Sequence, residues 1–270
     1  MKIGFIGGGN MATAIIQGII SSQLIPADNI WVSTKTNRCK ELENLYHIHA
    51  AKSNLELAAQ VDFIVLAVKP HIVPVVLKEI TPILEQKRVL LISIAAGLSL
   101  ENLQNLTLTL KEEPIIRVMP NMNVGIGQGV SAICSNSQVT ETEEQQVIGL
   151  FKTVGSTYLI PEKDFRIFTA IAGCSPAYTY LYIDSLARAG VKHGLSKDVA
   201  TQIAAEAVLG SADMITKSND SPWDLIDRVC SPGGTTIEGL LTLQEDKFTS
   251  AIVRALDATI EKDQKMELDN

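Results

Sequence analysis

Short apolar runs alternate with longer amphipathic stretches through the first 160 residues of the chain. The runs are rich in Val and Ile, which predicts β-strands at residues 2–7, 30–33, 62–68, 88–96 and 114–120, with two more at 129–134 and 156–160. Helical spacing of the apolar positions predicts helices between several of these runs, at residues 10–21, 37–46, 71–85 and 140–153. Because most of the strands are apolar throughout, the pattern predicts a mostly parallel sheet that helices cover on both faces.

The pattern changes after Pro161, where strand-like runs nearly disappear. Apolar residues there recur at helical spacing, which predicts helices at residues 163–173, 176–193, 197–217, 222–229, 235–244 and 246–266. We therefore expect two domains, an α/β domain over residues 1–160 and an all-α domain over residues 161–270. Apolar faces are abundant in the helical part and suit either a core of its own or packing against a second copy. We expect a homodimer or a larger homo-oligomer.

Composition excludes several classes of partner. The 270 residues include 46% hydrophobic residues and carry a net charge of −7. Neither half has the basic excess that binds nucleic acids or anionic membranes, so we expect neither partner. The longest apolar runs are far shorter than the roughly 20 residues that span a bilayer. Four dispersed cysteines without a CxxC pair, and a glycine motif where a signal peptide would lie, favour a reduced, cytoplasmic protein. The four histidines lack metal-ligand spacing, and we expect no metal.

The stretch KIGFIGGGNMATAI predicts a dinucleotide site. Its glycines follow a predicted strand and precede a predicted helix, in the pattern Gly7-x-Gly9-x-x-Ala12. Gly7 allows a tight turn, Gly9 lets the backbone approach a pyrophosphate, and Ala12 permits close packing of helix and strand. The positive N-terminus of the helix favours the same anion. In this context the motif predicts a Rossmann-type domain; a glycine-rich turn without a ligand is the alternative.

The end of the second predicted strand indicates which dinucleotide binds. Sites for NAD usually carry Asp or Glu there, bonded to the ribose 2′-hydroxyl. Here Ser33 is followed by residues 34–36, which include Lys35 but no carboxylate. Hydroxyls and a cation suit a 2′-phosphate, so we expect NADP, with NADPH preferred and NADH an alternative. The other interpretation is that Lys35 and Arg38 are only solvated surface residues.

Three later strands end in stretches that suit the same ligand. In an open α/β sheet, ligands bind outside the carboxyl ends of the strands. These ends read AVKPH (67–71), AAGLS (95–99) and RVMPN (117–121). Met119 and Pro120 suit an apolar wall for a nicotinamide ring. For Lys69, contact with the cofactor and simple exposure to solvent are equally good interpretations.

Five motifs carry a resemblance to a known family. GFIGGGNMA, LAVKPH, RVMPN, AGCSPAY and SPGGTTIEGL occur in this order, and together they resemble pyrroline-5-carboxylate reductases over nearly the whole chain. The last motif discriminates best, because many dehydrogenases share the Rossmann motifs among the others. The resemblance implies NAD(P)H-dependent reduction of 1-pyrroline-5-carboxylate to L-proline, the last step of proline biosynthesis. It also implies a Rossmann domain followed by a helical dimerisation domain, with the active site at the dimer interface.

The resemblance also implies roles for individual residues. It assigns cofactor binding to Ile6, Gly7, Gly9, Asn10, Met11, Ala12, Ser33, Lys35, Asn54, Ala67, Val68, Lys69, Pro70, Ala95, Gly97, Met119 and Pro120. It assigns substrate binding to Asn121, Ser231, Gly233, Gly234, Thr235 and Thr236, and makes Thr236 the catalytic residue beside the ring nitrogen. Two departures concern the substrate pocket. Met122–Asn123 follow where members usually have Thr-Pro, and Ala172 and Ser175 stand where Ser and Gly are common.

The chemistry of SPGGTTIEGL (231–240) agrees with that assignment. Two glycines followed by threonines at the start of a predicted helix present free N–H groups at its positive end, which suits a substrate carboxylate. We expect Thr235 to cap the helix and Thr236 to orient the imine nitrogen, since a protonated cyclic imine is already a good hydride acceptor. An ordinary capped helix is the alternative. In AGCSPAY (172–178) we expect one helix to break and another to start, with Pro176 in its first turn.

Two other functions stay open at this point. A related NADP-dependent reductase of imines or 3-hydroxyacids would share the architecture and use a lysine as acid, for which Lys192 is the nearest candidate. A non-catalytic dinucleotide-binding protein on the same fold is the second. An intact PGGTT stretch and a complete phosphate loop argue against it.

Overall fold

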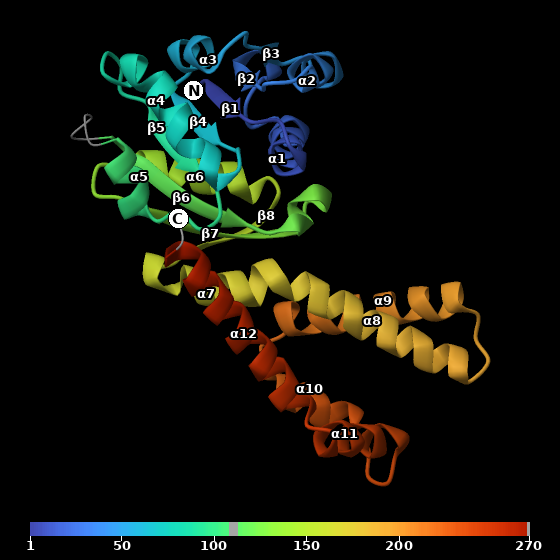
Figure 1. Ribbon diagram of the computed structural model, residues 1–270. Coiled ribbons are helices and arrows are strands. Elements are labelled where there is room, and N and C mark those ends of the chain that lie inside the picture. The colour runs from blue at the N-terminus through green and yellow to red at the C-terminus, as the bar shows by residue number, and fades with distance from the viewer. Residues whose placement is uncertain (108–112, 269–270) are drawn as a thin grey trace. The chain divides into compact units, whose positions relative to one another are not determined.

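One eight-stranded sheet organises the first part of the chain. The computed structural model describes residues 1–107 and 113–268, and its strands lie in the order β3-β2-β1-β4-β5-β6-β7-β8 (Figure 1). All neighbours are parallel except β6 and β7. The strands are β1 (Ile3–Ile6), β2 (Ile30–Ser33), β3 (His49–Ala50), β4 (Phe63–Leu66), β5 (Leu90–Ser93), β6 (Ile115–Pro120), β7 (Gly129–Ser135) and β8 (Gly155–Leu159).

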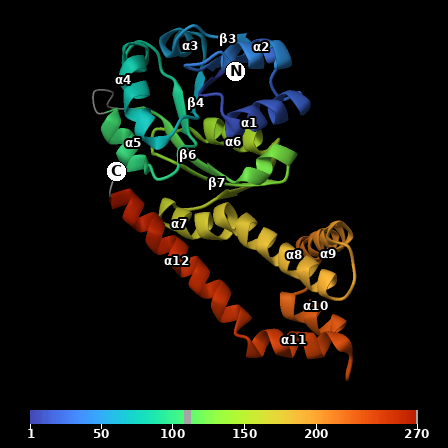
Figure 2. The ribbon, with the colours of Figure 1, turned by 45° about the vertical axis from the view of Figure 1, so that its right-hand side comes forward.

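Helices cover both faces of this sheet, as the apolar strands predict (Figure 2). One face packs against α1 (Asn10–Ser21), α2 (Arg38–Tyr46) and α6 (Glu141–Lys152). The other packs against α3 (Asn54–Gln60), α4 (Val73–Leu84) and α5 (Leu100–Leu106). Four short 3-10 segments complete the connections: Ala27–Asn29, Pro70–Ile72, Met122–Ile126 and Glu162–Asp164.

Alternate side chains of the inner strands enter opposite cores. In β4, Phe63 and Val65 belong to the core beside α1, whereas Ile64 and Leu66 belong to the core beside α4. This alternation is the two-residue period of a strand, and here both of its phases are apolar because both faces are covered.

Every strand that the sequence predicts is present in the structure. Three short elements were not predicted: β3, α3 and α5. The first has two residues and the two helices have seven each. Elements of that length are too short for an apolar period to identify them, and their place is fixed by packing on the sheet.

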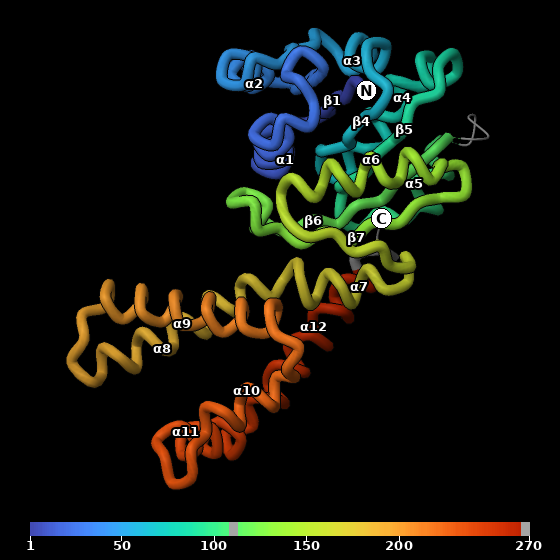
Figure 3. Tube along the Cα trace, turned by 180° about the vertical axis from the view of Figure 1, so that it is seen from behind, coloured from blue at the N-terminus to red at the C-terminus, as the bar shows by residue number. Residues whose placement is uncertain are grey.

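After Leu159 the described residues form helices only, in agreement with the change of pattern at residue 160. These helices are α7 (Phe165–Phe168), α8 (Ser175–Lys192), α9 (Lys197–Lys217), α10 (Pro222–Val229), α11 (Thr235–Glu245) and α12 (Phe248–Leu268). By its contacts the chain divides into two compact units, residues 1–173 with 260–270, and residues 174–259. In the second unit α8 and α9 run side by side (Figure 3). None of the described helices combines the length and the apolar character that crossing a membrane requires.

The expected break in AGCSPAY is wrong. A π-helical segment, Thr169–Cys174, joins α7 to α8 without interruption. Pro176 lies in the first turn of α8, as expected. Proline has no N–H for the helical ladder, so the preceding turn widens instead of ending the helix. The widened turn leaves the Ala172 carbonyl free to accept a hydrogen bond from the Asn121 amide, at 2.9 Å.

Candidate active site

The turn after β1 brings three strand ends together. Gly7 has a φ of +108°, a conformation that suits glycine. Its N–H donates to the Ser33 carbonyl at the end of β2, at 2.9 Å. The Ala67 N–H, just beyond β4, donates to the Ile6 carbonyl at 2.9 Å. A Cβ on Gly7 would lie 2.4 Å from the Ala67 oxygen, so only glycine fits where the chain passes so closely.

The N-terminus of α1 has the form of an anion site. Gly9 is its N-cap, and no side chain bonds to the N–H groups of the first turn. A Cβ on Gly9 would meet no atom within 4 Å, so open space adjoins this positive helix end. Ala12 is buried against the sheet, while Asn10 and Met11 retain exposure. These residues fit the pyrophosphate of a dinucleotide in the manner that the glycine pattern predicts.

Ser33 is the last residue of β2 and is joined to two other elements. Its hydroxyl donates to Asn54 Oδ1 at 2.8 Å, and Asn54 is the first residue of α3. Asn54 Nδ2 donates in turn to Glu79 Oε2 on α4, at 2.8 Å. Sequence reasoning found Ser33 and Asn54 but missed Glu79, because its distance along the chain gives no signal of this contact.

Two cations flank the same strand end. The Lys35 side chain is exposed. Arg38 bonds to Glu41 at 2.8 Å, and its Nε lies 3.4 Å from the Gly8 carbonyl in the phosphate loop. Arg38 is therefore attached to the loop and is more than a solvated surface residue.

The next two strands end level with these residues. The parallel register aligns Ile6 with Leu66, and Leu66 with Ser93. Beyond β4, Lys69 is the exposed N-cap of a 3-10 turn that Pro70 begins, and Val68 is partly buried. Beyond β5, Ala95 is buried and Gly97 has a φ of +77°. The structure thus gathers the sequence-predicted residues of β1, β2, β4 and β5 on one edge of the sheet.

Asn121 occupies a structural position at the end of β6. It is 5% exposed. Its Oδ1 accepts from the Asn123 and Val130 N–H groups, and its Nδ2 donates to Ala172. Met119 and Pro120 precede it in β6, and Met119 is partly buried.

The threonine loop lies in the second unit. Gly233 has a φ of +67°, and the Gly234 N–H donates to the Ser231 carbonyl at 3.0 Å. The helix α11 begins at Thr235, with Gly234 as its N-cap and no side-chain cap. The prediction that Thr235 caps the helix is therefore wrong, because the tight turn already places a glycine at that position. Thr235 and Thr236 are the first two helical residues, and both are exposed.

Among the described residues, the side-chain types that ligate metals are dispersed. In the described part of the chain, no three His, Cys, Asp or Glu side chains are grouped so that they could hold a metal ion. Burial is the main cause that raises the pKa of the Cys134 thiol to about 12, which keeps it protonated and unreactive at neutral pH.

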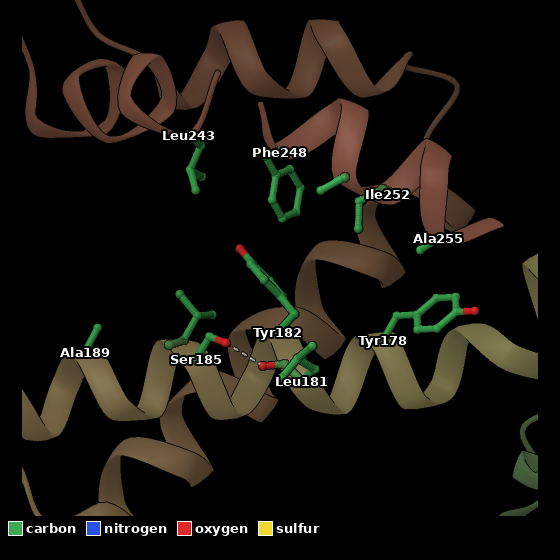
Figure 4. A pocket seen from close by; sticks show the side chains of 11 residues that line it. Tyr178, Leu181, Tyr182, Ser185, Ala189, Leu243, Phe248, Ile252 and Ala255 are labelled. Atoms are coloured by element: carbon green, nitrogen blue, oxygen red, sulfur yellow. Dashed lines mark hydrogen bonds between the residues drawn. The ribbon is translucent and has the colours of Figure 1, made fainter. Parts of the chain in front are cut away.

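The second unit also carries an apolar hollow. Tyr182 and Leu181 of α8 face Phe248 and Ile252 of α12 across it (Figure 4). Many large apolar side chains of this unit are exposed: Leu181, Leu209, Ile203, Trp223, Val229 and Val253 are each more than half exposed. Such exposure is typical of a surface that another molecule covers.

The Rossmann-type sheet, its glycine turn and the helical unit define a dinucleotide-dependent oxidoreductase. Residues 2–97 match a family model described as NADP oxidoreductase, coenzyme F420-dependent. Residues 162–266 match one described as pyrroline-5-carboxylate reductase dimerisation.

Whole-chain comparisons identify the family. The chain is 38% identical to the pyrroline-5-carboxylate reductase of Escherichia coli strain K12, over 98% of each protein. The Plasmodium falciparum pyrroline carboxylate reductase with NADP bound superposes with a TM-score of 0.87, at 37% identity over 99% of this chain and 98% of that one. The Streptococcus pyogenes 1-pyrroline-5-carboxylate reductase superposes with a TM-score of 0.86, at 41% identity over 98% of each chain. The chain belongs to the pyrroline-5-carboxylate reductase family, which confirms the resemblance and favours it over the two other functions.

Proposed function

We propose that this protein reduces 1-pyrroline-5-carboxylate to L-proline with NADPH as the preferred cofactor. The observation that carries the proposal is the start of α11, where a glycine turn and two exposed threonines open the helix without a side-chain cap, and Glu238 is the acidic residue of the first turn. A carboxylate beside a ring nitrogen is a substrate that such a site suits. The proposed roles of individual residues are those that the resemblance implies.

The edge of the sheet is proposed to hold the cofactor. Gly7, Gly9 and the N-terminus of α1 would bind the pyrophosphate, and Ser33, Lys35 and Asn54 would bind the adenosine ribose. The ends of β4, β5 and β6 would line the nicotinamide, which supplies the hydride when it is bound. Lys35 and Arg38 near the ribose position support a 2′-phosphate, and therefore NADPH over NADH.

The start of α11 is proposed to hold the substrate. The N–H groups after Gly233 and Gly234 would bind its carboxylate, aided by the hydroxyls of Ser231 and Thr235. Thr236 would place its hydroxyl at the ring nitrogen, where it orients the imine and holds the proton that the nitrogen needs. Asn121, through its bond to Ala172, would fix the wall beside the nicotinamide.

The helical part is proposed to form a homodimer in the cytoplasm. The match to the dimerisation model and the exposed apolar side chains of the second unit support the assembly. We propose a cofactor domain over residues 1–160 and a substrate and dimerisation domain over residues 161–270; the separate matches of residues 2–97 and 162–266 to the two family models support this division.

Proline formation tests the proposal. The purified protein is incubated with 1-pyrroline-5-carboxylate and NADPH or NADH, and both cofactor oxidation and L-proline are measured. We expect equal amounts of both products, with a higher kcat/KM for NADPH. A panel of 3-hydroxyacids and their ketones serves as the control and should give no turnover. Absence of proline, or faster turnover of a hydroxyacid, would overturn the proposal.

A further inference from the structure

A chain of two hydrogen bonds links the end of β2 to a carboxylate that the linear sequence does not reveal. Ser33 Oγ lies 2.8 Å from Asn54 Oδ1, and Asn54 Nδ2 lies 2.8 Å from Glu79 Oε2. The three residues belong to three elements, β2, α3 and α4. Ser33 is 4% exposed, while Glu79 is exposed to solvent.

The chemistry of these groups fixes the direction of both bonds. A carboxylate accepts hydrogen bonds and donates none, so Asn54 must turn its NH₂ group toward Glu79. The amide oxygen of Asn54 then faces Ser33. Since Ser33 has one proton, its hydroxyl must donate that proton to Asn54, and it keeps only acceptor lone pairs for any other partner.

This direction discriminates between the two forms of the cofactor. The end of the second strand is where a Rossmann-type site meets the adenosine ribose. A free 2′-hydroxyl can donate to an acceptor at that place, whereas a 2′-phosphate offers only acceptor oxygens and two negative charges near neutrality. The acceptor lone pairs of Ser33 therefore favour a ribose with a free 2′-hydroxyl over one with a 2′-phosphate. Lys35 and Arg38 have the opposite effect, because their positive charges attract the 2′-phosphate.

We propose that Glu79 is a positioning residue for cofactor choice. Acting through Asn54, it keeps the Ser33 hydroxyl proton directed at the Asn54 oxygen. As a result, the protein prefers a 2′-phosphorylated dinucleotide over its unphosphorylated form less strongly than it otherwise would. The inference rests on the proposed cofactor site at this edge of the sheet. It does not depend on the substrate that the enzyme reduces.

Glu79→Gln is the direct test, because glutamine can present either its oxygen or its NH₂ group to Asn54. Asn54 can then reverse, and Ser33 becomes free to donate to a phosphate. The dissociation constants of NADP⁺ and NAD⁺ are measured by titration calorimetry on the full-length protein. We expect the ratio Kd(NAD⁺)/Kd(NADP⁺) to rise about tenfold, the size expected for one hydrogen bond to a charged group.

Two further variants separate this mechanism from a simple loss of charge. Glu85→Gln removes an exposed carboxylate at the C-cap of the same helix and should leave the ratio within about twofold. In a Ser33→Ala background, Glu79→Gln should change the ratio by less than about twofold, since the hydroxyl that it redirects is gone. An unchanged ratio in the single variant, or an equal change with and without Ser33, would overturn the inference. A wild-type protein that binds neither nucleotide would overturn the proposed cofactor site itself.

Discussion

The guanidinium of Arg117 lies over the ring of Phe165, with its Cζ atom 4.6 Å from the ring centre. Its Nη1 donates to Glu162 Oε1 at 2.7 Å, and the same oxygen accepts from the Leu100 N–H at 2.7 Å. One carboxylate oxygen therefore joins β6, the segment after β8 and the first residue of α5. Gly97, proposed to lie near the nicotinamide, is three residues before Leu100 in the loop that this bond fixes.

Removal of that carboxylate should destabilise the sheet unit. In Glu162→Ala, the Arg117 guanidinium, only 13% exposed, and the Leu100 N–H both lose their acceptor. We expect the free energy of unfolding to fall by about 2 kcal/mol, the cost of leaving buried polar groups unpaired. Urea denaturation at pH 7 measures it. The matched control, Glu85→Ala, concerns an exposed residue and should change stability by less than about 0.5 kcal/mol. Equal effects of the two variants would contradict the role given to Glu162.

Glu143 should stabilise the protein at neutral pH and lose this effect in acid. Its hydrogen bond with Arg88 is the main cause that lowers the pKa of Glu143 to about 2, and bonds from Thr140 add to it. An unfolded glutamate titrates near pH ~4.3, so the stabilisation is present above that pH and is lost as pH falls toward 2. Glu143→Gln should be less stable than wild type by about 2 kcal/mol at pH 7 and by almost nothing at pH 2. Chemical denaturation at several pH values measures the difference; a difference that does not vary with pH would contradict the prediction.

Glu113 should show the opposite dependence on pH. It is 8% exposed, and burial raises its pKa to about 7 against the opposing charge of Arg88. Within the described residues, its Oε1 has no hydrogen-bond partner. Because the folded pKa exceeds that of the unfolded chain, stability is highest below pH ~4.3 and declines as pH rises through 7. Glu113→Gln should therefore match wild type near pH 4 and exceed it by about 2 kcal/mol at pH 8. A variant that is no more stable than wild type at pH 8 would refute the assigned shift.

The sheet and its glycine turn could be predicted from the sequence, because the residues that specify them are close together in the chain. Apolar strands, the turn at Gly7 and the small Ala12 are each specified within a few residues, and the structure confirms all three. The contacts of Glu79 and Glu162 join segments far apart in the chain, and no periodic pattern encodes which partner each carboxylate meets.

The threonine loop marks a different limit of sequence reasoning. Thr235 is a good N-cap residue, yet the cap is Gly234, because the turn with the positive φ of Gly233 lets the helix begin at Thr235, one residue earlier than a threonine cap at that position would allow. Residue preference identified the helix start within one position. The conformation of the turn, which no preference specifies, decided which residue takes the cap.

Thr236 is expected to affect the chemical step and to leave cofactor binding unchanged. Thr236→Ala removes the hydroxyl proposed to meet the ring nitrogen, so kcat should fall roughly 100-fold, at the lower end of general acid–base effects. The Kd of NADPH should stay within about twofold, since the cofactor residues are untouched. Thr242→Ala is the matched control, because that hydroxyl lies in the same helix and bonds to the Glu238 carbonyl. Full activity of Thr236→Ala would show that this role is wrong.

Replacing Gly7 or Gly9 of the phosphate loop by alanine should have different consequences. At Gly7 the φ of +108° and the Ala67 oxygen 2.4 Å from a Cβ both oppose a side chain. Gly7→Ala should therefore lower the free energy of unfolding by about 3 kcal/mol. At Gly9 the φ is −72° and a Cβ meets no protein atom within 4 Å, so Gly9→Ala should cost about 1 kcal/mol or less.

Cofactor affinity then separates a structural glycine from one that makes room for a ligand. The methyl group of Gly9→Ala would enter the space proposed for the pyrophosphate, so the Kd of NADPH should rise at least about tenfold in a protein that is still fully folded. Fluorescence titration with NADPH and thermal unfolding of the same samples measure both quantities. If Gly9→Ala binds NADPH as tightly as wild type, the open space beside α1 does not hold the pyrophosphate, and the cofactor must approach this edge of the sheet differently.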